Sequence, residues 1–467
     1  MIVNHAQRAH NHNWATLDPI IRSLLDTDYY KLSMLQFIWK YCPDTKVTFS
    51  LINRKKSVRI ADDIDEAELR RQLDHARSLR FTKSELIWLA GNTFYGLRGI
   101  FAPAFIAWLA DFRLPQYRLE KVDGQWVLTF EGRWEQTTMW EIYALSIINE
   151  LRTRAGLAKL GEFGLDILYA RAKAKLWSKI ERLRWIPGLK LADFGTRRRH
   201  SFLWQEYVVL ALKSELGDAF AGTSNAYLAY KHDMEAIGTY AHELPMTLAA
   251  LSLAGKLGDL SLKDSQYEVL RLWDEIYGGA MMISLPDTYG STQFYRNAPA
   301  WVAKAVSGIR LDSKDPFAGG DEAIEFFANA GEDPRTKLII ASDGLDVGDI
   351  VSLHAYFGGR VGDGFNARTD FHDAKDFLDR AKWTHEPRIR SSAGWGTLLT
   401  NDFRGCHPRG STDLDPISLV CKVSDVEGRP AVKLSDNYEK AIGPASEIAL
   451  YRETYGSDGV TGAPVLV

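Results

Sequence analysis

A histidine and a glutamate end a short apolar run in the segment GTYAHE (238–243). A histidine in such a place can act as a general base, a nucleophile or a metal ligand, although a lone histidine is more often a hydrogen-bonded core residue. No second histidine stands near His242 at the spacing of a zinc site, which argues against a metal centre. His232 lies in a preceding helical stretch, and we expect it on the surface.

Several carboxylates follow three later apolar runs, at Asp287, Asp312, Asp315, Asp343 and Asp346. Some of them are expected to be helix N-caps, which aspartate favours. Gathered at one place, they would also suit magnesium pyrophosphate, because Mg²⁺ prefers oxygen ligands. They would equally stabilise a positive sugar carbon in a transition state.

Three consecutive arginines, Arg197 to Arg199, follow Phe194-Gly195-Thr196. We predict that they begin a helix, where a cation opposes the helix dipole. That cost is better explained if at least one arginine meets an anion, since the planar guanidinium pairs well with phosphate or carboxylate. A solvated helix start is the alternative.

Two glycine-containing segments suit phosphate binding, namely Ser342-Asp343-Gly344 and Gly394-Trp395-Gly396-Thr397. Glycines let backbone N–H groups approach an anion, and a helix that follows adds partial positive charge. Glycines after strands are often only turns, so neither segment alone decides between the two interpretations.

Alternating apolar runs and helical segments position all of these residues. From about residue 189, seven apolar runs end in small and polar residues, at Phe194, Gly222, Gly238, Leu285, Gly308, Ser342 and Gly394. Helices are predicted between them at 202–216, 262–277, 321–330 and 347–357. Strands alternating with helices predict parallel βα units, and polar residues at the strand ends favour a TIM-like α/β barrel. A doubly wound open sheet would produce a similar pattern and remains an alternative.

The flanking segments predict a second, α+β domain. A helix is expected at 27–41, a β-hairpin at 117–134 with its turn at Asp123-Gly124, and a helix with one apolar face at 140–151. After residue 415 another hairpin turns at Glu427-Gly428, and we expect it to return to the N-terminal domain because two strands alone are marginally stable. We therefore divide the chain into an N-terminal domain (15–150), a catalytic barrel (151–410) and a returning C-terminal segment (411–467). The charged stretch 359–390 is expected to decorate the barrel.

The composition limits the class of protein. The chain has 467 residues, 46% of them hydrophobic, and a net charge of −3, so no overall basic field favours nucleic acid. Three separated cysteines without a C-x-x-C pair, no signal-peptide pattern and no apolar stretch of about 20 residues predict a cytoplasmic protein with no membrane partner.

Eight motifs in order carry a family resemblance. The chain resembles the bacterial ATP-dependent type of nicotinate phosphoribosyltransferase from about Leu24 to Gly443. The motifs are LLDTDYYKLSM (24–34), DFGTRRRHS (193–201), GTSN (222–225), GTYAHE (238–243), GIRLDSKDP (308–316), ASDGLD (341–346), GWGTLLTNDF (394–403) and KLSD (433–436). The resemblance implies an irregular TIM-like barrel with an additional α+β domain built from N- and C-terminal segments. It also implies a homodimer with shared active sites.

For the pyridine substrate, the resemblance implies a sandwich between Tyr30 and Phe194. Tyr29 occupies a neighbouring place, and Tyr30 itself competes with a plain core interpretation because it stands in a helical stretch. Arg310 would lie near the ring and its carboxylate, and Arg197 would be a second cation for phosphate or carboxylate.

For the phosphorylated groups, the resemblance implies that His242 is phosphorylated transiently by ATP and that Asp287 orients its imidazole. Glu243 would belong to the same catalytic group, and Asp312 would bind substrate. The loops around the ribose and its 5′-phosphate would be formed by Ser342, Asp343, Gly344, Gly394, Gly396 and Thr397.

The implied reaction joins nicotinate to phosphoribosyl pyrophosphate, with ATP as co-substrate and Mg²⁺, and it salvages nicotinate for NAD. A nicotinamide-using relative and a catalytically weak homologue that senses NAD precursors are the alternatives. One departure from the family pattern supports the second alternative: Lys314 stands where the family usually has glycine in D-S-G-D. Lysine there could add a cation near phosphate or alter the turn, unless φ is already negative.

Overall fold

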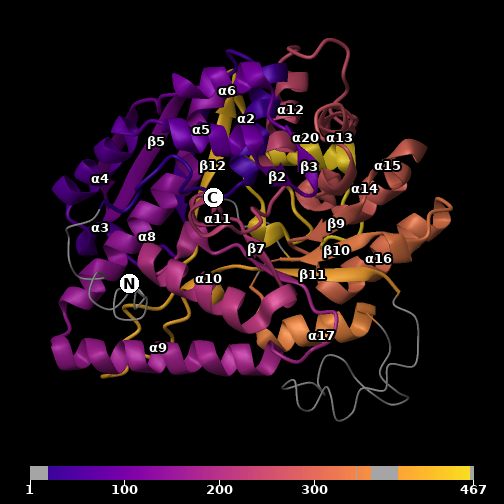
Figure 1. The fold of residues 1–467 in the computed structure, drawn as a ribbon. Helices are drawn as coiled ribbons and strands as arrows, with labels where there is room; N and C mark the ends of the chain where they lie inside the picture. Colours follow the sequence, from indigo (N-terminus) through magenta and orange to yellow (C-terminus); the bar gives the residue numbers. More distant parts are fainter. Residues whose placement is uncertain (1–18, 343, 359–387, 463–467) are drawn as a thin grey trace.

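Two sheets organise the residues that the structure describes. The computed structural model covers residues 19–342, 344–358 and 388–462, and Figure 1 shows their arrangement. One sheet is antiparallel with the strand order β13-β12-β1-β5-β4, and the other is parallel with the order β7-β6-β11-β10-β9-β8.

The described N-terminal part contains five strands of its own and a set of covering helices. Its elements are α2 (Tyr30–Tyr41), β1 (Lys46–Asn53), α3 (Ile60–Asp63), α4 (Glu66–Ser78), α5 (Lys83–Gly91), β2 (Thr93–Phe94), β3 (Leu97–Arg98), α6 (Pro103–Ala110), β4 (Tyr117–Val122), β5 (Gln125–Arg133), α7 (Trp134–Thr137), α8 (Trp140–Ala158) and α9 (Glu162–Leu183). β2 and β3 pair only with each other, so β1, β4 and β5 are its contribution to the antiparallel sheet.

The barrel part alternates strands with helices. Its elements are β6 (Leu191–Asp193), η1 (Thr196–Arg198), α10 (Phe202–Leu216), η2 (Gly217–Ala219), β7 (Phe220–Thr223), α11 (Ala226–His232), α12 (Glu243–Leu253), α13 (Ser265–Asp274), η3 (Gly279–Met281), β8 (Ile283–Ser284), η4 (Pro286–Thr288), α14 (Ser291–Asn297), α15 (Ala300–Ala305), β9 (Gly308–Leu311), α16 (Pro316–Asn329), η5 (Pro334–Thr336), β10 (Leu338–Ala341), α17 (Val347–Gly358), β11 (Arg390–Trp395) and α19 (Thr397–Thr400).

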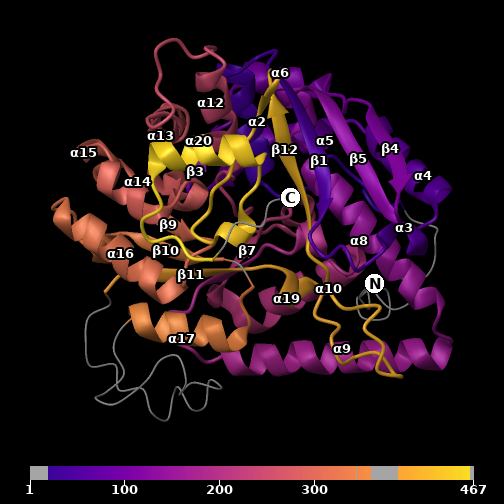
Figure 2. The same cartoon turned by 180° about the vertical axis from the view of Figure 1, so that it is seen from behind.

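The C-terminal part returns to the antiparallel sheet. It contains β12 (Leu419–Val426), β13 (Arg429–Pro430), η6 (Tyr438–Lys440) and α20 (Ala445–Tyr455). β12 pairs with β1 from Val426 opposite Val47 to Leu419 opposite Asn53. Seen from behind, α20 lies near α12 and α13 (Figure 2), where Tyr451 and Tyr455 pack around Tyr289.

Both predicted hairpins are confirmed, and the same turn chemistry forms them. At the first turn Asp123 and Gly124 have φ of 49° and 75°, and at the second Glu427 and Gly428 have φ of 53° and 80°. Two successive positive φ values match the right-handed twist of the flanking strands, and glycine adopts them at little cost. The domain boundaries at 150 and 410 stay a prediction.

Two helix predictions need correction. The first helix begins at Tyr30 rather than at residue 27, because the N–H of Tyr29 donates to the Ser224 carbonyl and Asp28 bridges to Asn225. These contacts hold the residues before Tyr30 against the end of β7. The helix predicted at 140–151 runs from Trp140 to Ala158 and is buried on nearly every side rather than on one apolar face. It lies between the antiparallel sheet and the barrel, so its polar residues are buried as well.

The parallel sheet curls into an irregular barrel, as predicted. All six strands and residues 237–239 line one central cavity, which an open doubly wound sheet would not enclose. Of the seven predicted strands, the one that ends at Gly238 is reduced to a single parallel bridge between Thr223 and Ala236. The chain is tightly packed there: a Cβ on Gly222 would lie 2.2 Å from the Glu235 carbonyl oxygen.

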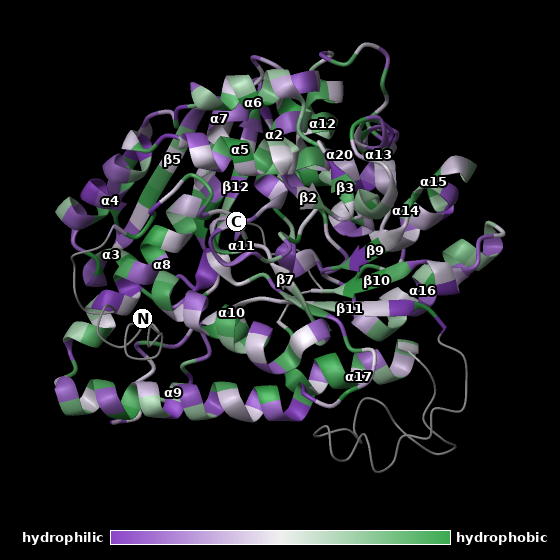
Figure 3. Ribbon diagram, in the orientation of Figure 1, coloured by the Kyte–Doolittle hydropathy of each residue, from purple (hydrophilic) through white to green (hydrophobic). Residues whose placement is uncertain are grey.

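The four predicted barrel helices are present, with shifted ends. α10 matches the predicted range, α13 is shorter, α16 starts five residues earlier at Pro316, and α17 ends one residue later. The outer helix α9 mixes hydrophilic and hydrophobic residues along its length (Figure 3). Among the described residues, no helix has the length and apolar character needed to cross a membrane. Most of the charged stretch 359–390 lies outside the described residues.

Candidate active site

The central cavity has a volume of about 640 Å³ and follows the barrel axis. Residues that precede or begin the strands line one end of it, including Gly188, Ser307 and Arg390, and strand-end residues line the other. The polar motifs of the sequence lie at this second end, where parallel βα barrels carry their chemistry.

Tyr30, Tyr95 and Phe194 line the cavity, and the sequence predicted two of them, Tyr30 and Phe194. Tyr30 begins α2, and Phe194 follows β6. Glycines make room for both rings: a Cβ on Gly238 would lie 3.2 Å from the Tyr30 Cβ, and a Cβ on Gly394 would lie 3.3 Å from the Phe194 ring. Tyr30 therefore lines the cavity of its own chain.

Tyr29 lies in the core instead. Its ring is fully buried and stacks on Phe94 with ring centroids 4.8 Å apart. Tyr30 therefore lines the cavity, whereas its neighbour Tyr29 packs in the core.

Two arginines lie near the aromatic pair but differ in their freedom to bind an anion. Arg310 on β9 lines the cavity, and its nearest carboxylate oxygen, Asp312 Oδ1, is 3.9 Å away. Its Nε is buried and has no hydrogen-bond partner among the described residues. Arg197 already lies 3.6 Å from Asp28 and 3.4 Å from Glu141. Arg310 is thus the better-placed donor for a ligand carboxylate.

A histidine cluster, which we define as His242, Asp287, Asp312 and Lys433, lies beside this cavity. Nε2 of His242 is 3.2 Å from Asp312 and 3.4 Å from Asp287, while Nδ1 is 2.9 Å from the Thr288 hydroxyl. Lys433 Nζ is 3.2 Å from Asp287 and 3.8 Å from Asp312. Asp312 therefore touches both the histidine and the arginine of the cavity.

Burial sets the protonation of the cluster. Desolvation lowers the pKa of His242 to about 4, because it disfavours the imidazolium more than the neighbouring carboxylates favour it. Burial alone would raise the pKa of Asp287 and Asp312, but their contacts with His242 and the positive charge of Lys433 lower both, and Arg310 lowers the pKa of Asp312 further. At neutral pH the cluster holds a neutral imidazole and two carboxylates.

The same cluster has the geometry of a cation site. Ligand atoms of His242, Asp287 and Asp312 all lie within 4.8 Å of one another. Oδ1 of Asp287 is buried and has no hydrogen-bond partner among the described residues. Lys433 already neutralises part of the negative charge, so these residues fit a magnesium ion that brings its own water or phosphate oxygens.

The predicted phosphate loops lie around the cluster, and only part of them reaches the cavity. The Ser342 hydroxyl donates to Asp312 at 3.0 Å. Gly344 has φ of 63°, a conformation that favours glycine, and Asp343 lies outside the described residues. Gly394 lines the cavity, whereas Gly396 caps and Thr397 begins the short helix α19.

Several charged residues that the sequence singled out have structural partners. Glu243 turns away from the His242 ring and binds Lys31 and the Trp134 N–H, so its predicted catalytic role is not supported by a contact. Asp315 caps α16 and Asp346 pairs with Lys179. His232 is partly buried and contacts Glu206 at 2.8 Å rather than standing free on the surface.

The arginine triplet does not begin a helix, because α10 starts only at Phe202. Residues 196–198 form a 3-10 turn, and Arg199 is fully buried in a two-pronged ion pair with Asp26 at 2.6 and 2.8 Å. The predicted anion partner is therefore present for Arg199, but this anion is the carboxylate of Asp26 and not a ligand.

Lys314 points away from the cluster. Its Nζ lies 2.6 Å from Glu322 and 3.0 Å from the Thr292 hydroxyl, and its φ is not positive. The family's usual glycine is therefore not required for backbone conformation here, and Lys314 adds no cation to the cluster.

Two contributors to the cluster were not identified from the sequence. Lys433 is part of the KLSD motif, but nothing in its local sequence indicated that the segment after the C-terminal hairpin would place it beside Asp287. Thr288 follows Asp287 directly, and its role as the Nδ1 partner depends on the turn η4.

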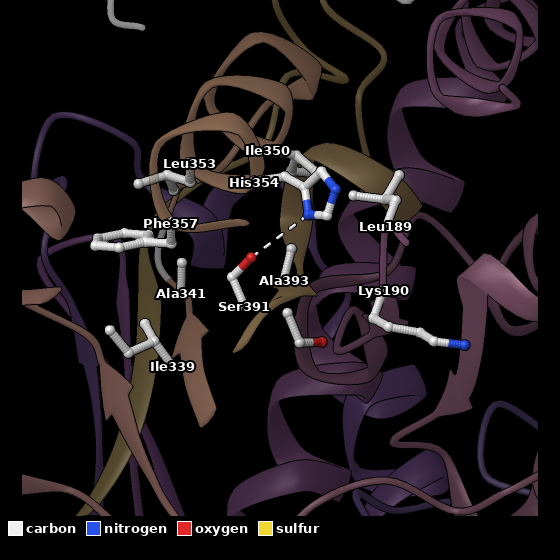
Figure 4. Close-up of a pocket in the computed structure, with 11 residues that line it drawn as sticks. Leu189, Lys190, Ile339, Ala341, Ile350, Leu353, His354, Phe357, Ser391 and Ala393 are labelled. Carbon is white, nitrogen blue, oxygen red and sulfur yellow. Dashed lines mark hydrogen bonds between the residues drawn. The ribbon is translucent and has the colours of Figure 1, made fainter. Parts of the chain in front are cut away.

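A second cavity under α17 is too small for a substrate. It holds about 10 Å³, room for about one water, between α17 and the barrel strands. Figure 4 shows its mainly apolar lining, with Ser391 and His354 Nδ1 3.5 Å apart. The central cavity is therefore the candidate site.

The comparisons with known proteins agree with this geometry. Residues 25–149 match the model of the nicotinate phosphoribosyltransferase N-terminal domain, and residues 189–458 match the model of the nicotinate phosphoribosyltransferase family.

Solved structures extend the match to almost the whole chain. A nicotinate phosphoribosyltransferase from Porphyromonas gingivalis is 26% identical, with a TM-score of 0.75 over 94% of this chain and 100% of its own. One from Vibrio cholerae is 29% identical, with a TM-score of 0.75 over 94% of each chain. A protein from Saccharomyces cerevisiae, 24% identical with a TM-score of 0.73 over 94% of this chain and 99% of its own, supports the fold alone. The chain belongs to the nicotinate phosphoribosyltransferase family.

Proposed function

We propose that the protein forms nicotinate mononucleotide and pyrophosphate from nicotinate and phosphoribosyl pyrophosphate, and that ATP hydrolysis through a phosphohistidine at His242 drives the reaction. One observation carries the proposal: Asp312 joins an aromatic-lined cavity containing Arg310 to a buried, neutral histidine.

The cavity supports the choice of substrate. Tyr30 and Phe194 provide apolar faces for a flat ring, and Arg310 provides a guanidinium whose Nε has no hydrogen-bond partner in the part of the chain that the structure describes. A nicotinate carboxylate would satisfy that donor, whereas the neutral amide of nicotinamide would leave a buried charge less well paired. The ring nitrogen would attack the anomeric carbon as the bond to pyrophosphate breaks.

The histidine cluster supports phosphoryl transfer. Nε2 faces the ionised Asp287 and Asp312, so in the neutral imidazole Nε2–H donates to Asp312, and Nδ1 accepts from the Thr288 hydroxyl. As Nε2 attacks, its proton would pass to one of these carboxylates. Nε2 would form a bond to the γ-phosphorus of ATP as the bond to ADP breaks, and water would later cleave the phosphohistidine. Magnesium, held through Asp287 and Asp312, would offset the charge of the phosphates. Lys433 would contribute a second positive charge at the same place.

The proposal is tested by incubating the protein with phosphoribosyl pyrophosphate, magnesium and either pyridine, with and without ATP, and following mononucleotide and pyrophosphate. Faster turnover of nicotinate than of nicotinamide, increased by ATP, is expected. A preference for nicotinamide would indicate the nicotinamide-using alternative, and no turnover of either would indicate the weak, sensing homologue. Homodimer formation and a cytoplasmic location stay predictions.

A further inference from the structure

A fully buried lysine lies between the two halves of the site. Lys31 Nζ is 2.7 Å from Glu141 and 2.5 Å from Glu243, and it donates to the Thr138 hydroxyl at 3.2 Å. Lys31 thus donates hydrogen bonds to Glu243 and Thr138 and forms an ion pair with Glu141. The side chains of Lys31, Glu141 and Glu243 are each at most 1% exposed.

Glu141 extends this contact toward the cavity. One of its oxygens binds Lys31, and the other lies 2.7 Å from Lys422 and 3.4 Å from Arg197. Arg197 also lies 3.6 Å from the buried Asp28. These six residues form a buried charge network of three cations and three carboxylates, in which Arg197 is the most exposed member.

The network begins and ends beside residues of the site. Lys31 follows Tyr30 at the start of α2, and Glu243 follows His242 at the start of α12. Ser33 donates to the Thr239 carbonyl at 2.7 Å, which binds the same two segments a second time. Any displacement of the start of α12 must therefore act on Lys31, and through Glu141 on Arg197.

Charge favours this role over simple packing. A buried ion pair often stabilises a protein no better than apolar side chains of the same size would. Charged groups also make the positions of their neighbours depend on one another, which apolar groups do not. Lys31 and Arg197 both contact Glu141, so each limits how closely Glu141 can approach the other.

From these contacts we propose that Lys31 is a positioning residue that couples the state of His242 to nicotinate binding at Tyr30 and, through Glu141, to the position of Arg197. The inference rests on the proposed function, because it requires that ATP changes the affinity for nicotinate. Coupling between two sites is measured as the factor by which one ligand changes the affinity for the other.

The test compares the KM for nicotinate with and without ATP in the wild type, Lys31→Met and Glu243→Gln. Gln keeps the volume of Glu243 and an acceptor for Trp134 but removes the charge that holds Lys31. We expect the ATP-dependent factor to fall at least fivefold in both variants. Lys31→Met leaves the buried Glu243 without its ion-pair partner and can fail to fold, in which case Glu243→Gln alone decides.

Lys337→Met is the matched control. Lys337 is also buried, at 5% exposed against 0% for Lys31, but it donates to the Ala303 and Val306 carbonyls at the opposite end of the barrel strands. It should lower the melting temperature and leave the ATP-dependent factor unchanged. The inference is overturned if Glu243→Gln keeps the wild-type factor, or if Lys337→Met loses it too. A wild type without any ATP effect overturns the proposed coupling itself, and the inference with it.

Discussion

The cavity and the histidine cluster share Asp312, yet different forces hold them. The cavity is bounded by strand residues and aromatic rings, and glycines at 238 and 394 give the rings of Tyr30 and Phe194 their space. The cluster consists of charged groups buried within hydrogen-bonding reach of one another, brought in by four separate segments. In the proposed function, the shape of the cavity would select the pyridine ring, whereas the balance of buried charges in the cluster would prepare His242 for phosphoryl transfer.

The largest effect is expected from a substitution that removes the proposed nucleophile of the cluster and leaves the cavity unchanged. His242→Asn should abolish labelling by γ-labelled ATP and separate ATP hydrolysis from synthesis, because asparagine has no nucleophilic ring nitrogen. Slow synthesis without ATP should remain, since Tyr30, Phe194 and Arg310 are untouched. Labelled ATP and mononucleotide formation measure the two outcomes.

The control is His232→Asn, which changes a histidine that contacts Glu206 far from the cluster. Its labelling should match the wild type. Undiminished labelling of His242→Asn would exclude His242 as the phosphoryl acceptor.

The next effect removes the charge of the cavity. Truncating one partner of a buried charge pair costs about 3–5 kcal/mol, which corresponds to roughly 10²- to 4 × 10³-fold in affinity. Arg310 is about four-fifths buried, so Arg310→Ala should approach the lower end of that range in kcat/KM for nicotinate. In this variant, the ratio of kcat/KM for nicotinate to kcat/KM for nicotinamide should fall by a similar factor.

Arg390→Ala is the matched control, because Arg390 lines the same cavity at its other end and contacts backbone carbonyls. It should leave the preference between the two pyridines unchanged. If Arg310→Ala keeps the wild-type preference, another residue recognises the carboxylate.

The sequence predicted the fold and several site residues, but it did not predict the contacts that these residues make. Hairpins, the four barrel helices and the barrel itself followed from local patterns, since turn residues and apolar periodicity act over a few neighbours. The family motifs supplied Tyr30, Phe194, Arg310 and His242 as candidates. The partners of these residues depend on long-range packing, so neither Lys433 beside Asp287 nor Lys31 beside Glu243 could be inferred.

The failures have the same physical cause. Glu243 and the arginine triplet were assigned from their sequence neighbours, but tertiary contacts with Lys31 and Asp26 decide where their side chains lie. The helix at 140–151 was predicted to bury only one apolar face. Glu141 is nevertheless buried, because Lys31 and Lys422 pair with it, and no local sequence pattern indicates those partners.

A smaller effect tests the charge balance of the cluster. The pKa of His242 is about 4 in the folded protein and 6.5 when the side chain is solvated. Its contribution to stability is therefore complete above about pH 6.5 and is lost as the pH falls toward 4. Lys433 lowers the pKa of His242, so Lys433→Met should raise this pKa and move the acid limb of phosphohistidine formation to higher pH.

A pH series of γ-phosphate labelling measures that shift. Lys256→Met, which changes an exposed lysine, should keep the wild-type limb. An unmoved limb in Lys433→Met would show that desolvation alone sets the protonation of His242.

The smallest effect separates the two neighbouring tyrosines, and so tests whether the cavity works by shape. Tyr30→Leu keeps most of the apolar volume and loses the flat face, and an offset aromatic contact contributes about 0.5–1.5 kcal/mol beyond burial. The KM for nicotinate should rise about 2–10-fold, because each 1.4 kcal/mol is a factor of ten, while the KM for phosphoribosyl pyrophosphate changes little. Tyr29→Leu should show the opposite result, because Tyr29 stacks on Phe94 in the core: a lower melting temperature with normal nicotinate kinetics. If Tyr30→Leu instead melts early and binds nicotinate normally, Tyr30 is a packing residue and the ring is held by Phe194 and Arg310 alone.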